Sequence, residues 1–242
     1  MADARRSPTV GKKRVAVGVV IAAGGTGKRM GGPVPKQFLR LGRRTILEHT
    51  VALFNAHPSV GEIVVVVPRG HLEDSAWIVH RGNLRKVTRV VAGGRDRQES
   101  VWNGLNSFVK SPHLVLVHDA VRPLVRRRVL NAVILQARRW GAAAVGVKVK
   151  ETIKREDEKG FFTRTLDRSA LWSIQTPQGF DFRVLHVAHK KARASGFLGT
   201  DDASLVERNG RKVRIVEGDY DNVKITTVED LEFAAMVLRK DR

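Results

Sequence analysis

Short, almost continuous runs of apolar residues alternate along the chain with segments in which apolar residues recur every three or four positions. The runs predict buried strands at Val15–Ile21, Glu62–Val67, Val87–Val91, Leu114–His118 and Ala143–Lys148. The intervening segments predict helices at Ile46–Ala56, Leu72–His80, Glu99–Val109 and Arg126–Trp140. Apolar strands separated by helices are typical of a mostly parallel sheet. We therefore predict an α/β, Rossmann-like fold with helices on both faces of the sheet.

Three of the predicted strands end in unusual sequence. The segments that follow them are Ala22–Lys36, Ala92–Ser100 and His118–Pro123. In open α/β sheets, ligands bind outside the carboxyl ends of the strands. We expect these three segments to converge on one crevice.

Residues 151–171 interrupt the alternation because they are polar and charged. Lys159-Gly160 forms a predicted turn between Thr152-Ile153-Lys154 and Phe161-Phe162-Thr163. We predict a projecting β-hairpin arm over about residues 150–172. An isolated hairpin is marginally stable in water, so we expect the arm to pack against a second subunit; the alternative is a monomer with a flexible insertion. Residues 1–14 are predicted to be a disordered basic tail, and 15–242 a single domain.

The chain has no cysteine. This excludes disulfides, cysteine-based zinc sites, iron–sulfur clusters and a thiol nucleophile. The sequence has no apolar stretch of about 18 residues, the length that a membrane-spanning helix requires. Basic residues before the first apolar run superficially resemble a signal peptide, but the run leads into Gly24-Gly25-Thr26-Gly27 rather than a cleavage site. A buried first strand is the better interpretation, and we expect a cytoplasmic protein.

The net charge of +20, from 44 Lys+Arg against 24 Asp+Glu, raises the hypothesis of nucleic-acid binding. The basic residues are spread along the chain, however, and aromatic residues make up only 6% of it. No stacking motif of the kind found in RNA-binding domains is present. A solvated basic surface is the favoured interpretation.

The glycine cluster at residues 24–27 follows a strand, where backbone N–H groups can bind a phosphate. It fits neither the P-loop pattern, because Arg29 follows Gly27-Lys28, nor the dinucleotide fingerprint, because Met30 replaces the third glycine. Lys28, Arg29 and Lys36 lie beside it. Cations around backbone donors suit a triphosphate. The alternative is a mobile basic surface loop.

Six ordered motifs carry a family resemblance. They are Ala22-Ala23-Gly24-Gly25-x-Gly27-x-Arg29-Met30-Gly31 continuing to Pro35-Lys36-Gln37-Phe38, Gly93-Gly94-Arg95-x-Arg97-Gln98-x-Ser100-Val101, Val117-His118-Asp119-Ala120-x-Arg122-Pro123, Gln175-Thr176-Pro177-Gln178-Gly179-Phe180, Thr200-Asp201-Asp202-Ala203-Ser204 and Asn222-Val223-Lys224-Ile225-Thr226-Thr227. In this order, from about Val15 to the C-terminus, the chain resembles the cytidylyltransferases of non-mevalonate isoprenoid synthesis. Ribitol-5-phosphate cytidylyltransferases share most of the motifs and often have two successive glycines, as here. The motif at residues 175–180 favours methylerythritol phosphate as the acceptor.

The resemblance implies transfer of the cytidylyl group of CTP to 2-C-methyl-D-erythritol 4-phosphate, with release of pyrophosphate. It implies Mg²⁺ or another divalent cation as the cofactor, with Asp119 in the metal site. It assigns catalytic roles to Arg29, Lys36 and Lys224. It assigns CTP binding to Ala22, Ala23, Gly24, Gly25, Gly94, Arg95, Ser100 and Asp119, and acceptor binding to Arg122, Thr152, Arg168 and Thr176.

The same resemblance implies a homodimer whose arms are exchanged, so that Thr152 and Arg168 serve the neighbouring subunit. Two of the assigned residues have simpler alternatives. Lys224 could be an ordinary lysine at a strand edge, and Asp119 could cap the turn after its strand. Outside this family, a basic nucleic-acid-binding protein on an α/β scaffold is the remaining hypothesis, supported only by the net charge.

Overall fold

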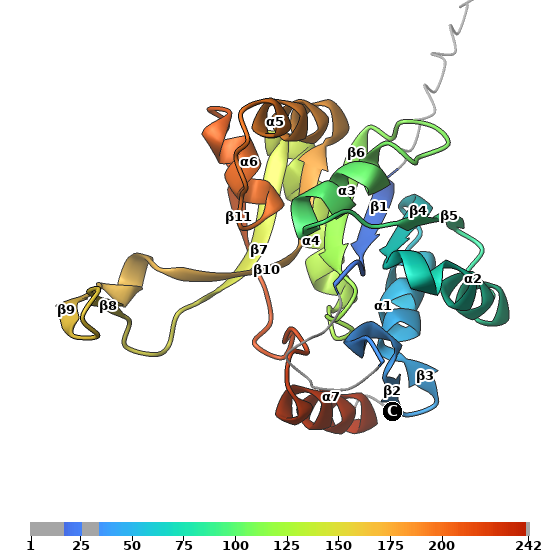
Figure 1. The fold of residues 1–242 in the computed structure, drawn as a ribbon, viewed down its shortest axis with the longest axis horizontal. Coiled ribbons are helices and arrows are strands. Elements are labelled where there is room, and N and C mark those ends of the chain that lie inside the picture. Colours follow the sequence, from blue (N-terminus) through green and yellow to red (C-terminus); the bar gives the residue numbers. More distant parts are fainter. Residues whose placement is uncertain (1–16, 26–33, 241–242) are drawn as a thin grey trace, which may run out of the picture.

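A computed structural model describes residues 17–25 and 34–240 of the chain. Its centre is a seven-stranded sheet in the order β11-β7-β10-β6-β1-β4-β5 (Figure 1). Every neighbouring pair is parallel except the two pairs that β10 makes with β6 and β7. The strands of this sheet are β1 Val17–Ala22, β4 Val60–Val67, β5 Val87–Ala92, β6 Leu114–Asp119, β7 Ala142–Lys148, β10 Trp172–Asp181 and β11 Arg214–Glu217. The predicted mostly parallel α/β sheet is confirmed.

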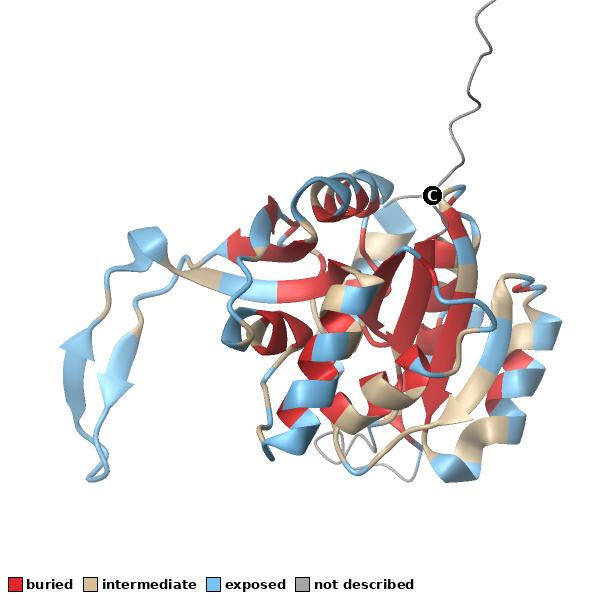
Figure 2. Ribbon diagram, turned by 90° about the horizontal axis from the view of Figure 1, so that it is seen from above, coloured by how far each residue is buried: buried red, intermediate tan, exposed pale blue. Residues whose placement is uncertain are grey.

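Helices cover both faces of the sheet. They are α1 Ile46–Asn55, α2 Leu72–Arg81, α3 Arg97–Leu105, α4 Arg127–Trp140, α5 Phe182–Ala194, α6 Asp202–Arg208 and α7 Val228–Lys240. One core cluster joins α1 and α4 to one face of the sheet, and a second joins α3, α5 and α6 to the other. A smaller cluster packs α7 against the short hairpin of β2 (Arg40–Leu41) and β3 (Arg44–Thr45). Burial is concentrated in the central strands (Figure 2).

Helix α3 begins at Arg97, two residues before the predicted start at Glu99, and ends at Leu105 rather than Val109. The Asp96 side chain determines this start, because its carboxylate accepts a hydrogen bond from the backbone N–H of Glu99. The loop between β5 and the helix is thereby shortened. Residues 93–96 are left at the carboxyl edge of the sheet.

The predicted hairpin arm is present and projects away from the sheet (Figure 1). Its strands, β8 Lys154–Glu156 and β9 Phe162–Thr165, pair antiparallel, and Gly160 adopts a positive φ of 84° in the turn. The first strand lies about two residues later than predicted. All seven residues of β8 and β9 are exposed (Figure 2). A single-turn 3-10 helix at Arg168–Ala170 leads from the arm into β10.

Two sequence predictions fall outside the described residues: the basic tail at 1–14, and the glycine-loop cations Lys28 and Arg29. Within residues 17–25 and 34–240, none of the helices combines the length and the apolar character that crossing a membrane requires.

Candidate active site

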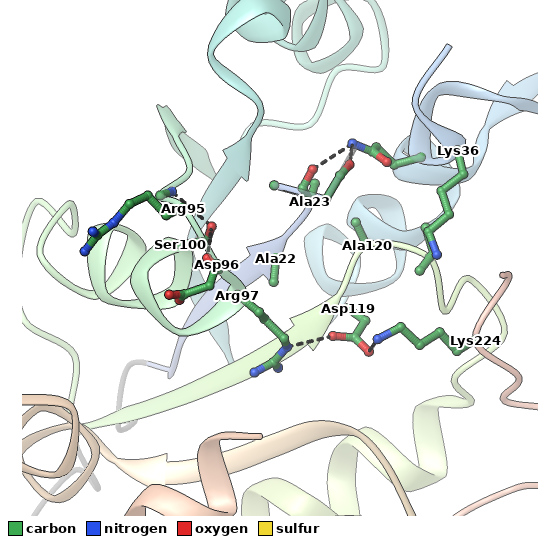
Figure 3. Close-up of a pocket in the computed structure, with 15 residues that line it drawn as sticks. Ala22, Ala23, Lys36, Arg95, Asp96, Arg97, Ser100, Asp119, Ala120 and Lys224 are labelled. Carbon is green, nitrogen blue, oxygen red and sulfur yellow. Dashed lines mark hydrogen bonds and ion pairs between the residues drawn. The ribbon is translucent and has the colours of Figure 1, made fainter. Parts of the chain in front are cut away.

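The three loops predicted to converge do so at the carboxyl ends of β1, β5 and β6. They line a cavity of about 450 Å³, here called the first cavity (Figure 3). Its lining is Ala22, Ala23, Gly24, Gly25, Lys36, Gln37, Gly94, Arg95, Asp96, Arg97, Ser100, Asp119, Ala120, Val121 and Lys224. All eight residues predicted to bind CTP are in this set, together with two of the three predicted catalytic residues.

Close backbone approaches shape the floor of the first cavity. A Cβ on Gly24 would lie 2.8 Å from Ser100 Oγ, and one on Gly93 would lie 2.9 Å from the same atom. The Ser100 hydroxyl donates to Asp96 O at 2.7 Å and accepts from Gly94 N at 3.1 Å. The hydroxyl proton of Ser100 is therefore engaged in the hydrogen bond to Asp96 O. Ser100 holds the loop that carries Gly94.

Gln37 fixes the first residues of the glycine loop by hydrogen bonds to their backbone. Its amide Nε2 donates to Ala23 O at 2.7 Å and to Gly25 O at 3.0 Å. Gln37 follows Lys36 in a single-turn 3-10 helix, so the two hydrogen bonds that tie down the loop also place Lys36 at its edge. Figure 3 shows the Lys36 side chain pointing toward the part of the first cavity where Ala120 and Lys224 lie.

Asp119 is the last residue of β6, and three cations surround its buried carboxylate. Figure 3 shows two of them, Arg97 and Lys224. Arg97 Nε lies 3.3 Å from Oδ1, while Lys224 Nζ and Arg122 Nε lie 3.0 Å and 3.5 Å from Oδ2. Burial alone would raise the pKa of Asp119, but the charges of Arg97, Lys224 and Arg122 outweigh it and hold the pKa well below its usual range. Asp119 is therefore an anion that orients cations.

A second cavity, of about 430 Å³, lies on the other side of these groups. It shares Arg97, Asp119 and Lys224 with the first cavity, and Arg122 and Thr176 also line it. Its remaining lining residues are Ala144, Ile174, Gln175, Gln178, Thr200, Asp201, Ala203, Ser204, Glu207, Val213, Arg214 and Ile215. Arg97, Asp119 and Lys224, here called the shared wall, thus separate two spaces that could each hold one reactant.

Thr176 on β10 fixes the last two residues of β6, His118 and Asp119, by hydrogen bonds. Its hydroxyl accepts from Asp119 N at 3.0 Å and lies 3.1 Å from Nδ1 of His118. His118 Nε2 lies 3.0 Å from the carbonyl of Arg122, so Nε2 carries the proton and the Thr176 hydroxyl donates to Nδ1. Burial lowers the pKa of His118 to about 4, which keeps the ring neutral.

The segment that carries Lys224 is held at both ends. Ile225 N donates to Val121 O at 2.9 Å, and the Asn222 side chain donates to Thr176 O at 3.0 Å. Arg122 in turn donates to Asn222 O at 2.7 Å. These bonds tie the Lys224 segment to the loop after β6 and to β10. An ordinary strand-edge lysine would not require this support, and Lys224 lies in no strand.

Comparison with known proteins identifies the family. The sequence model of the 2-C-methyl-D-erythritol 4-phosphate cytidylyltransferase family matches residues 17–240. The chain belongs to this family. It is 45% identical to the 2-C-methyl-D-erythritol 4-phosphate cytidylyltransferase of Geobacillus thermodenitrificans over 90% of this chain and 95% of the relative. It is 43% identical to that of Desulforamulus reducens over 91% and 95%.

Solved structures agree. The 4-diphosphocytidyl-2C-methyl-D-erythritol synthase of Anaerococcus prevotii superposes with a TM-score of 0.81 at 32% identity, covering 93% of this chain and 96% of that one. The 2-C-methyl-D-erythritol 4-phosphate cytidylyltransferase of Thermus thermophilus gives 0.75 at 35% identity, covering 93% and 99%. The family resemblance inferred from the six motifs is confirmed.

The cytidylyltransferase fold brings most of the predicted residues together, with clear exceptions. Arg122 and Thr176 line the second cavity, whereas Thr152 and Arg168 line neither cavity of their own chain. The Arg168 guanidinium donates instead to the carbonyl of Lys150 at the base of the arm. The third predicted catalytic residue, Arg29, lies outside the described residues.

Several motif residues to which the sequence assigned no role lie at the site, and three of them bear on its chemistry. Arg97 belongs to the shared wall, Gln37 holds the glycine loop, and Thr200 lines the second cavity. Arg97 was detectable in principle, since it follows the helix cap Asp96 at the carboxyl end of a parallel strand. Its position between two cavities was not, because this depends on its ion pair with Asp202 of α6, a residue distant in the sequence.

The described residues of the site offer few ligands for a divalent cation. Within residues 17–25 and 34–240, no three His, Asp or Glu side chains gather closely enough to hold a metal. Asp119 is the carboxylate on the shared wall, and both of its oxygens face cations. Mg²⁺ commonly binds through one or two carboxylates together with substrate phosphates. The site would therefore fit a cation that arrives with a nucleotide, and Asp119 is the residue that would hold it.

Proposed function

We propose that this protein transfers the cytidylyl group of CTP to 2-C-methyl-D-erythritol 4-phosphate, giving 4-diphosphocytidyl-2-C-methyl-D-erythritol and pyrophosphate. One observation carries the proposal: two cavities meet at the shared wall of Arg97, Asp119 and Lys224. The first cavity has a glycine-rich backbone edge and Lys36, which suit a nucleoside triphosphate. The second has Arg122 and the polar groups of β10 and α6, which suit a phosphorylated polyol.

The reaction needs charge neutralisation more than proton transfer. An ionised oxygen of the acceptor phosphate forms a bond to the α-phosphorus of CTP, and the bond from that phosphorus to the bridging oxygen breaks. The electron pair leaves with pyrophosphate. No proton has to be removed from the nucleophile, so no general base is required. Lys224 and Arg97 lie where the two anions would meet, and preorganised cations stabilise the charge that develops there.

Lys36 and Arg29 bind the triphosphate from the glycine-loop side in this proposal, and Gly94, Arg95 and the ends of β1 bind the cytosine. Mg²⁺, or another divalent cation held by Asp119 and the phosphates, would neutralise charge on the triphosphate when bound. Because Lys224 Nζ lies 3.0 Å from Asp119, the same carboxylate also fixes the lysine before substrates arrive.

We propose that the active form is a homodimer in which each arm completes the neighbouring site. The arm is exposed along its length, and its phenylalanines Phe161 and Phe162 are 69% and 74% exposed. Large apolar side chains this exposed on a projecting hairpin favour a protein partner. Thr152 and Arg168 would then bind the acceptor in the second cavity of the partner. A protein that consumes CTP depends on the nucleotide pool of the cell, so we propose a cytoplasmic location.

The test is pyrophosphate release with CTP and Mg²⁺, comparing 2-C-methyl-D-erythritol 4-phosphate with ribitol 5-phosphate. We expect strong preference for the methylerythritol phosphate. Preference for ribitol 5-phosphate would retain the chemistry and overturn the acceptor. Release with neither acceptor would overturn the proposed function. The family match makes the nucleic-acid hypothesis unnecessary, since its only support was the net charge.

A further inference from the structure

A buried pair of residues behind the shared wall has no part in the chemistry described so far. Asp202 is the first residue of α6, and its side chain is 1% exposed. One of its oxygens accepts from Arg97 Nη1 at 2.7 Å, and the other accepts from His189 Nε2 at 3.0 Å. His189 is itself fully buried in α5. Asp202 lines neither cavity, so it can reach a substrate only through Arg97.

Arg97 is fixed at two of its three guanidinium nitrogens. Nε donates to Asp119 at 3.3 Å, and Nη1 donates to Asp202 at 2.7 Å. The third nitrogen, Nη2, has no hydrogen-bond acceptor among the described residues. The Arg97 side chain lines both cavities. Because a guanidinium is planar, two fixed nitrogens determine the direction of the third. The arrangement leaves Nη2 as the donor for a phosphate at the shared wall.

The elements joined by this ion pair are already held together by other bonds. Gln178 of β10 donates to Asp201 at 2.7 Å and accepts from Ala203 N at 3.0 Å, which fixes the start of α6 on both sides of Asp202. Gln98 of α3 donates to Phe197 O at 3.0 Å and accepts from Gly199 N at 2.9 Å. The attachment of α3 to the segment before α6 therefore does not depend on Asp202.

We infer that Asp202 is a positioning residue for cytidylyl transfer, which holds the Arg97 guanidinium on the shared wall while His189 holds Asp202 from behind. A buried carboxylate is costly unless it is paired, and here both oxygens have partners. Between Asp119 and Asp202 the guanidinium has a carboxylate at either end. It cannot turn away from the place where the two anions meet.

The inference rests on the proposed function, and a double-mutant cycle tests it in the full-length enzyme. Asp202→Asn keeps the side-chain volume but replaces a charge-assisted hydrogen bond with one about half as strong. His189 can adapt by moving its proton to Nδ1, which has no hydrogen-bond partner among the described residues. Arg97→Gln removes the guanidinium. Kinetic constants and melting temperatures are measured for the wild type, both single variants and the double variant.

We expect Arg97→Gln to lower kcat about 100-fold and Asp202→Asn about 10-fold, with smaller changes in KM for CTP. The double variant should match Arg97→Gln within about twofold, since Asp202 acts only through Arg97. Glu48→Gln is the matched control. It weakens another buried carboxylate–arginine pair, Glu48 with Arg81 at 2.8 Å, away from both cavities, and it should leave kcat unchanged.

Three outcomes would overturn the inference. They are an unchanged kcat in Asp202→Asn, an unchanged kcat in Arg97→Gln, and multiplicative losses in the double variant. An active wild-type enzyme with any of these results would leave the proposed function standing. A wild-type enzyme that releases no pyrophosphate would overturn the proposed function, and the inference with it.

Discussion

Replacing Thr176 by valine tests the hydrogen bonds that fix the end of β6. Valine has nearly the same shape as threonine but no hydroxyl. The variant would leave two buried groups without a partner, Asp119 N at 3.0 Å and His118 Nδ1 at 3.1 Å. Each unsatisfied buried group costs about 1–3 kcal/mol, so we expect a loss of about 3 kcal/mol in the free energy of unfolding. For a chain of this length, that corresponds to a melting temperature lower by about 6–12 °C.

Thr176→Ser is the matched control, because it keeps the hydroxyl and removes one methyl group. It should cost about 1 kcal/mol, and its melting temperature should lie between those of the wild type and the valine variant. The assay is thermal unfolding followed by circular dichroism, supported by urea titration. Equal melting temperatures for the serine and valine variants would refute the reasoning. The only proton of the Thr176 hydroxyl is donated to His118. The hydroxyl can therefore accept a hydrogen bond from a hydroxyl group of the phosphorylated substrate, but it cannot donate one to the phosphate.

Three further predictions address loop packing, pH and assembly. Gly24→Ala should lower the melting temperature, because its Cβ would lie 2.8 Å from Ser100 Oγ, whereas Gly25→Ala, with nothing within 4 Å, should not; thermal scans of the two variants decide this. The pKa of His118 is about 4 in the folded protein against an ordinary value of 6.5, so the unfolded chain takes up the proton first as pH falls. The free energy of unfolding should therefore fall between pH 6.5 and 4, by up to about 3 kcal/mol, and urea titrations of His118→Gln should show a smaller fall. Finally, if arms are exchanged, mixing the inactive variants Lys224→Ala and Arg168→Ala should restore about a quarter of the wild-type activity after subunit exchange, because one site in each mixed dimer is intact. Continued inactivity of the exchanged mixture would contradict the shared site.

The central strands were predictable because they are apolar on both faces. Val64, Val65 and Val66 of β4 are all fully buried, and such runs occur mainly in parallel sheets covered by helices. The glycine loop and the motif around Asp119 were likewise visible, since they follow these strands directly. Their placement at one cavity then follows from the parallel topology.

Strand β10 was not predicted, although it lies in the middle of the sheet. Its buried residues include Gln175, Thr176 and Gln178, whose polarity hides the strand from an analysis of apolar patterns. Each of these side chains hydrogen-bonds to a partner outside β10: Asp219, His118 and Asp201 respectively. A polar strand is stable at this place only because distant segments supply those partners. A single sequence does not show that pairing.

The same strand also joins the arm to the second cavity without an intervening loop. β10 begins at Trp172, two residues after the last residue of the arm's 3-10 helix, Ala170, and reaches Thr176 four residues later. Trp172, Ser173 and Ile174 pair in register with β7, and side chains alternate between the two faces of a strand, so a one-residue insertion among them would turn the side chains there to the opposite face. An insertion at the turn around Gly160 would leave them in place. Among natural variants of this chain, arm length should therefore vary at the tip and stay constant at the base.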